Sequence, residues 1–305
     1  MQIDLQQRYS NLEKLLSSDL TCSNSLQLVL RKSDISENQV KHIAQKISKL
    51  VDIRSLKIDL SENILLEEAT KSLSKAIGQC INLQELELIF FSSGIGQEGL
   101  KSIGLNLSNC SKLISLKLDL IKNSIYDQGV IELVNGLRSC QSLTNLSIDL
   151  YMNHVSSLGL LEILKFLGSH KKIEIFTLNL HYNNLGDEEK ANQFVQTGES
   201  MCCSNLKTMN LYLSRSYFGI IAIAYIASFI GSQINLTNLH FEIIGSKILD
   251  QHKLILAKSL KNCQKLVYLY LDLSPSWYSH QSFEGEKLFK LVNKMKRLVQ
   301  KKVVF

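Results

Sequence analysis

Residues 113–125 read LISLKLDLIKNSI, and segments with the same pattern recur at intervals of thirty residues in this 305-residue chain. A three-residue insertion interrupts the interval once, after residue 173. The other copies begin at Ile53, Leu83, Leu143, Ile173, Leu206, Leu236 and Leu266, and an earlier copy contains Leu26, Leu28 and Leu30. Nine copies in one register identify the chain as a repeat array.

Each copy predicts a short strand, a turn and a helix. Apolar and variable residues alternate within LISLKLDL, which is the period of a half-buried strand. Later positions have helical spacing, as in Leu100, Ile103 and Leu107. Glycine recurs at one fixed point of this helix, where we expect it to pass close to a neighbouring coil: Gly99, Gly129 and Gly159.

A single repeat cannot bury both its strand and its helix, so the repeats must stack. The predicted fold class is therefore α/β: a horseshoe-shaped solenoid with a parallel β-sheet on the concave face and helices on the convex face. Residues 1–22 are predicted to form an N-terminal capping helix. Residues 23–305 are predicted to form the repeat domain, with about nine full repeats plus a terminal strand in RLVQKKVVF, residues 297–305. The basic segment before this strand is predicted to be the ninth helix.

The repeat pattern LxxLxLDLxxNxI, followed by a helix and a small residue or cysteine, resembles the ribonuclease-inhibitor-like class of leucine-rich repeats. The spellings LISLKLDLIKNSI and LTNLSIDLYMNHV are similar to 30-residue repeats abundant in ciliate proteins, some of which also carry kinase domains. The resemblance covers about residues 23–305; no segment here resembles a kinase. It implies the solenoid fold, but not a function. It also implies a ladder of asparagines that bond the turn backbone: Asn63, Asn123, Asn153 and Asn183.

Composition narrows the class of protein. The net charge of +6 is mild, and much of it lies in residues 287–302, whereas a nucleic-acid binder usually spreads such charge along one face, so no nucleic acid is expected. The apolar stretch 218–231 is shorter than the ~20 residues of a membrane-spanning helix. With an odd number of cysteines and no signal-peptide pattern at the start, we expect reduced thiols and a cytoplasmic location, with a cilium association as one form of it.

The cysteines indicate packing rather than chemistry. They share one repeat position, six residues before the central strand residue, and His170 occupies the same position in its repeat: Cys80, Cys110, Cys140, Cys203 and Cys263. Small, soft side chains suit the point where a helix returns to a strand. The sequence contains no zinc-type cysteine pairs, glycine-rich phosphate loop or hydrolase signature. We therefore predict no catalytic site, no metal and no cofactor, and hence no enzyme.

Function is expected on the concave face, where the residues between the inward leucines point outward. One column reads Asp59, Ile89, Asp119, Asp149, Asn179, Tyr212, Glu242 and Asp272. Its neighbour reads Lys57, Glu87, Lys117, Ser147, Thr177, Asn210, His240 and Tyr270. An acidic stripe of this kind would attract a basic protein partner and disfavour phosphate backbones. Alternatively, aspartate is repeat consensus that keeps the sheet soluble.

Aromatic residues gather in the second half of these columns, with Tyr151, His181 and Tyr182 at the nearby loop edge. Aromatic clusters are common anchors of interfaces, although packing between rungs is the simpler interpretation. Trp277 is expected in an exposed loop, and the apolar helix around 218–231 is expected to be covered by something. The predicted partner-binding residues are Asp59, Asp119, Asp149, Tyr212, His240, Glu242, Tyr270 and Asp272.

The leading hypothesis is a non-catalytic scaffold or adaptor that binds a protein on its concave sheet. One alternative is a structural subunit of a large ciliary or mitochondrial assembly, which the apolar helix favours. A third is a small-GTPase regulator, which would need a loop side chain such as Arg215 aimed at the nucleotide.

Overall fold

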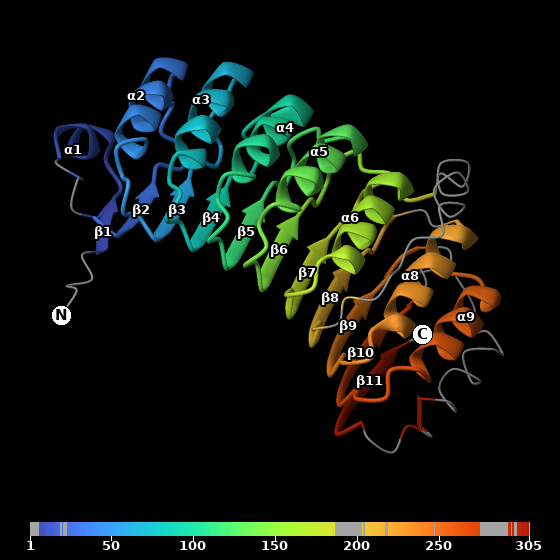
Figure 1. Ribbon diagram of the computed structural model, residues 1–305. Coiled ribbons are helices and arrows are strands. Elements are labelled where there is room, and N and C mark those ends of the chain that lie inside the picture. Colours follow the sequence, from blue (N-terminus) through green and yellow to red (C-terminus); the bar gives the residue numbers. More distant parts are fainter. Residues whose placement is uncertain are drawn as a thin grey trace. The chain divides into compact units, whose positions relative to one another are not determined.

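The computed structural model describes residues 6–18, 20, 23–186, 203, 205–216, 219–246, 248–274, 292–293, 295 and 298–304. The chain divides into two compact units, Met1–Asn153 (unit 1) and His154–Phe305 (unit 2). In each unit strands and helices alternate along the chain (Figure 1). Trp277 and most of the basic segment 287–297 lie outside the described residues.

Unit 1 is a parallel sheet whose strands follow one another in chain order. Its strands are β1 (Gln6–Tyr9), β2 (Ser25–Val29), β3 (Ser55–Asp59), β4 (Glu85–Ile89), β5 (Ser115–Asp119) and β6 (Asn145–Asp149). Its helices are α1 (Leu12–Ser17), α2 (Glu37–Ile47), α3 (Glu67–Gly78), α4 (Gly96–Leu107) and α5 (Asp127–Leu137). Each of the helices α2 to α5 lies beside the next and covers one face of this sheet (Figure 1).

Unit 2 repeats the arrangement with α6 (Ser157–Ser169), α8 (Ile220–Ser232) and α9 (Asp250–Leu260). Its parallel strands, again in chain order, are β7 (Ile175–Asn179), β8 (Thr208–Tyr212), β9 (Asn238–Glu242), β10 (Tyr268–Asp272) and β11 (Gln300–Val304). Strand β11 lies within the segment for which a terminal strand was predicted. In the 1–22 segment, where only a capping helix was predicted, β1 precedes α1 and pairs with β2.

The core of each unit is built from leucine ladders, as the thirty-residue period predicts. The register pairs Leu26 with Leu56, Leu56 with Leu86 and so on, so equivalent leucines stack on one another and are almost fully buried. The opposite face of each sheet carries no helix from the described part of the chain, and we call it the open face (Figure 1). This alternation of parallel strand and helix confirms the predicted leucine-rich-repeat solenoid class.

Side chains at the turns satisfy the buried backbone, as the asparagine ladder predicted. The Asn63 amide nitrogen donates to the carbonyls of Leu30 and Leu60, while its oxygen accepts from the backbone N–H groups of Ser33 and Ile35. Asn123 and Asn153 repeat these contacts in unit 1, and Asn183 does so in unit 2. Without them, polar groups of a buried turn would be left unbonded.

The cysteine position is a packing site, as predicted. The thiols of Cys80, Cys110, Cys140, Cys203 and Cys263 are buried, and each donates to a carbonyl of the preceding repeat. Burial raises the pKa of Cys80 and of Cys140 to about 12. Such thiols are unreactive at neutral pH, because the thiolate is the nucleophile.

Two glycines bring α4 and α5 into backbone contact. A Cβ atom placed on Gly136 would lie 1.8 Å from the carbonyl oxygen of Gly104, and one on Gly104 would lie 2.5 Å from that of Glu132. The predicted close approach at Gly129 is also present, with Gln97 at 3.1 Å, but it is looser.

Helix α8 has no large apolar side chain exposed among its described side chains. Tyr225 and Ala227 are 8% and 0% exposed, and the exposed position is Ser228. The expected cover is supplied by the protein itself at these positions: a nearly all-apolar helix here reflects burial over most of its circumference.

Candidate interaction surface

The strand register places the predicted residues side by side within each unit. In unit 1, Asp119 pairs with Ile89 on one side and with Asp149 on the other. In unit 2, Glu242 pairs with Tyr212 and with Asp272, while His240 pairs with Tyr270. The two outward columns therefore exist on the open face of each unit.

The aspartates of the column that begins with Asp59 stabilise the ends of their strands. In unit 1 the carboxylates of Asp59, Asp119 and Asp149 each accept from the backbone N–H two residues later, at 3.0, 3.3 and 3.0 Å. In unit 2, Asn179 and Asp272 make the same contact, each at 3.0 Å. Short acceptor side chains are favoured where they can bond their own backbone two positions on. This contact explains why aspartate recurs in the repeat, an explanation the sequence had suggested only as solubility.

Three charged side chains on the open face of unit 1 form a paired group. Glu87 on β4 lies between Lys57 on β3 and Lys117 on β5, with N–O distances of 2.7 and 2.8 Å. Burial by itself would raise the pKa of Glu87, but hydrogen bonds from the two lysines lower it below its ordinary value. Lys57 and Lys117 therefore add positive charge beside the column of aspartates, so the face is less acidic than the stripe expected from the sequence.

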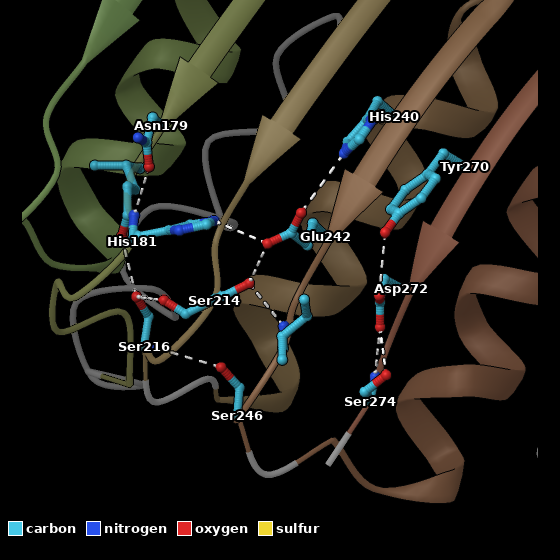
Figure 2. Close-up of polar contacts among 12 residues, drawn as sticks. Asn179, His181, Ser214, Ser216, His240, Glu242, Ser246, Tyr270, Asp272 and Ser274 are labelled. Carbon is cyan, nitrogen blue, oxygen red and sulfur yellow. Dashed lines mark hydrogen bonds and ion pairs between the residues drawn. The ribbon is translucent and has the colours of Figure 1, made fainter. Parts of the chain in front are cut away.

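The open face of unit 2 holds a cluster centred on Glu242 (Figure 2). His181, just after β7, places Nε2 at 3.4 Å from Oε1, and His240 on β9 places Nε2 at 3.6 Å from Oε2. Ser214 Oγ donates to Oε1 at 3.0 Å. The three ionisable side chains are only 17–21% exposed. One carboxylate thus has an imidazole beside each of its oxygens.

Aromatic rings form a continuous row across the same face. His181 meets Tyr212 edge to face at 5.9 Å, and Tyr212 lies 4.8 Å from His240. His240 stacks on Tyr270 at 4.2 Å with an angle of 10° between the rings. Lys302 of β11 then places its ammonium 5.1 Å from the centre of the Tyr270 ring. The row therefore extends from the end of β7 to β11.

Asp272 is the most buried ionisable side chain of the cluster, at 6% exposure. Its carboxylate accepts from the Tyr270 hydroxyl at 3.2 Å and from both the backbone N–H and the hydroxyl of Ser274 (Figure 2). Burial, together with the charge and hydrogen bond of Asp272, raises the pKa of Tyr270. The hydrogen bond to Asp272 fixes the orientation of the Tyr270 ring in the row.

Burial also governs the histidine at the other end of the row. It lowers the pKa of His181, and the cation of Arg215 acts in the same direction, while Glu242 opposes both. Arg215 itself lies over the ring of Tyr182, 5.2 Å from its centre, at the adjoining turn. The neutral form of the His181 ring is therefore favoured more than in an exposed histidine.

The structure thus unites five of the eight predicted residues in unit 2: Tyr212, His240, Glu242, Tyr270 and Asp272. The other three, Asp59, Asp119 and Asp149, lie on unit 1. The sequence had placed His181 only near the loop edge, and it did not single out Ser214 or Lys302. Lys302 could have been found from the predicted β11 register, which aligns it with Tyr270.

Two absences concern the part of the chain that the structure describes. Within it, no three histidine, cysteine or carboxylate side chains gather in a way that could hold a metal ion. Among the same residues, no helix combines the length and apolarity needed to cross a membrane.

No family model matches the sequence, and no curated protein does either. Among solved structures, the chain is similar to internalin C2 of Listeria monocytogenes, with 16% identity, 77% of this chain and 84% of that chain covered, and a TM-score of 0.43. Another internalin of the same organism has 12% identity, 93% and 75% coverage, and a TM-score of 0.48. Likenesses at this level do not identify a function.

Proposed function

We propose that this chain is a non-catalytic scaffold or adaptor that binds a protein partner through the open face of unit 2. The observation that carries the proposal is the row of rings from His181 to Tyr270 above the two carboxylates. Tyrosine offers large contact area at low conformational cost, and aromatic side chains are the usual anchors of interfaces. The surrounding Thr177, Asn210 and Asn238 add hydrogen-bonding groups of the kind that recognition surfaces use.

The partner we propose is basic. Glu242 and Asp272 are neighbours in the register, and tyrosine rings attract cations through their faces. Lys302 supports this choice, because its ammonium already occupies the face of Tyr270 within the protein itself. The same two carboxylates would repel a phosphate backbone, so nucleic acid is not the proposed ligand.

We also propose a class for the repeats and a cellular location for the protein. The asparagine ladder and the buried cysteine position support the ribonuclease-inhibitor-like class of repeats, and the repeat spelling supports the likeness to ciliate proteins. Buried thiols in the cysteine position support a reducing, cytoplasmic environment, with a cilium association as the likeness implies. Neither alternative function gains support, because the apolar positions of α8 are covered and Arg215 lies on Tyr182.

Binding of synthetic peptides tests the proposal. Peptides of equal length composed of Arg and Gly, of Glu and Gly, or of Ser and Gly are titrated against the full chain at pH 7.5 and low salt. We expect only the Arg peptide to bind. The variant Glu242→Gln should lower the affinity for this peptide about tenfold or more, because the substitution removes a negative charge close to the ligand. The matched control is Glu162→Gln, the same change on helix α6.

Two results would overturn the proposal. One is equal binding of the three peptides, and the other is an equal loss of affinity in Glu162→Gln and Glu242→Gln. The variant Tyr212→Ala separates ring contact from charge, because it removes the ring between the two histidines but keeps Glu242. We expect it to weaken the Arg peptide as well.

A further inference from the structure

We infer that the open face of unit 2 is a proton-operated surface that binds a basic partner near neutral pH and releases it on mild acidification. This inference rests on the proposed function and adds its regulation. The device consists of His181 and His240, whose Nε2 atoms both face the carboxylate of Glu242.

The geometry leaves the two imidazoles poised to take up protons beside one carboxylate. Both Nε2 atoms are shielded from solvent, and that of His240 makes no hydrogen bond to any described residue. At 3.4 and 3.6 Å from the oxygens of Glu242, each is too far for a strong hydrogen bond when neutral. Protonation of either ring turns that contact into an attractive ion pair with Glu242.

The groups that face the histidines determine the change in charge. Arg215 follows β8, and Lys302 on β11 adds a second cation at the far end of the row. Glu242 on β9 and Asp272 on β10 are the two anions. Burial raises the pKa of Tyr212 and of Tyr270, so their hydroxyls stay neutral at these pH values. The four charged groups sum to about zero, so protonation of both histidines makes the face about +2.

The charge on the two histidines determines whether Glu242 can bind a basic ligand. Glu242 is available to an incoming ammonium or guanidinium group while the histidines are neutral. Once they are charged, they neutralise Glu242 and repel the same ligand group. Because burial holds the pKa of His181 below its ordinary value of 6.5, the change takes place in mildly acidic solution, below the pH at which an exposed histidine is half protonated.

The test measures binding of the Arg and Gly peptide at pH 7.5 and pH 5.0, at constant ionic strength, since this peptide does not titrate in that range. We expect affinity to fall about tenfold or more at pH 5.0 in the wild type. The double variant His181→Gln, His240→Gln should bind about equally at both pH values, whereas the control His154→Gln, an exposed histidine elsewhere in unit 2, should behave as wild type. Circular dichroism at both pH values confirms that each variant is folded.

A second measurement does not depend on any ligand. Histidine ring resonances are followed by NMR from pH 8 to pH 4.5 in the wild type and in Glu242→Gln. We expect the pKa of His181 to fall further when Glu242 is replaced, because the charge of that carboxylate raises it.

The outcomes separate the two proposals. Peptide binding that is independent of pH, or a pH dependence that survives in the double variant, overturns the proton-operated release and leaves the proposed function standing. If the peptide binds at neither pH, the basic partner is wrong, and the NMR titration decides whether the surface takes up protons at this cluster. A His181 ring that titrates independently of Glu242 would overturn it.

Discussion

The contact between helices α4 and α5 predicts a large effect of one added methyl group. In Gly136→Ala the new Cβ would lie 1.8 Å from the carbonyl oxygen of Gly104, whereas carbon and oxygen normally approach to about 3.3 Å. The obstructing atom is backbone, so it cannot rotate away, and the helices must separate by about 1.5 Å at this point. Overpacking of this kind costs about 3 kcal/mol, against a gain of about 1 kcal/mol in helix propensity. We expect the free energy of unfolding to fall by about 2 kcal/mol.

Urea unfolding followed by circular dichroism at 222 nm measures this change. The matched control is Gly129→Ala in the same helix, where the nearest atom of Gln97 is 3.1 Å away and needs to move only a few tenths of an ångström. We expect that variant to lie within about 1 kcal/mol of wild type. If Gly136→Ala proved as stable as wild type or more stable, as helix propensity alone predicts, the close approach of the two helices would be refuted.

Three further predictions concern the turns, the thiols and the histidines. Asn123→Ala should lower the free energy of unfolding by about 3 kcal/mol, because it leaves several buried backbone groups without partners; urea titration measures this, and a loss below about 1 kcal/mol contradicts it. The thiols of Cys80 and Cys140 should not react with a disulfide reagent at pH 8 until the protein is unfolded, since burial raises their pKa to about 12; rapid native labelling would disprove this. Because the pKa of folded His181 is lowered, the unfolded chain binds its proton more tightly, so stability should decline as the pH falls below 6.5. His181→Gln should remove part of that decline, as judged by unfolding at pH 7.5 and pH 5.0.

Much of the fold could be predicted because the repeat period acts directly on packing. A spacing of thirty residues with apolar alternation leaves one register in which leucines stack, and the observed pairing of Leu56 with Leu86 follows that register. The asparagine and cysteine positions were predicted for the same reason, since an equivalent position in every repeat meets an equivalent environment. Within each unit, the columns of outward residues followed as well.

Other features depended on how side chains from different columns meet. The aspartates were predicted as a charged stripe, but each folds back on its own backbone, and in unit 1 the lysines beside Glu87 add counter-charges. The position of a residue in the repeat predicts that its side chain points outward. That position does not predict which neighbouring side chain it contacts. Likewise, the apolar sequence of α8 predicted that the helix is buried, but not whether this chain or a partner buries it.

The sequence by itself determined the repeat register, the parallel sheet and the identity of the ladders, because each follows from a spacing that every repeat shares. Only the tertiary structure decided that His181, from beyond the end of β7, reaches Glu242 two strands away on β9. It alone decided that Gly104 and Gly136 touch, although they do not occupy equivalent repeat positions. Both contacts depend on the angle at which elements cross and on the rotamers that packing allows, and neither quantity is periodic in the sequence.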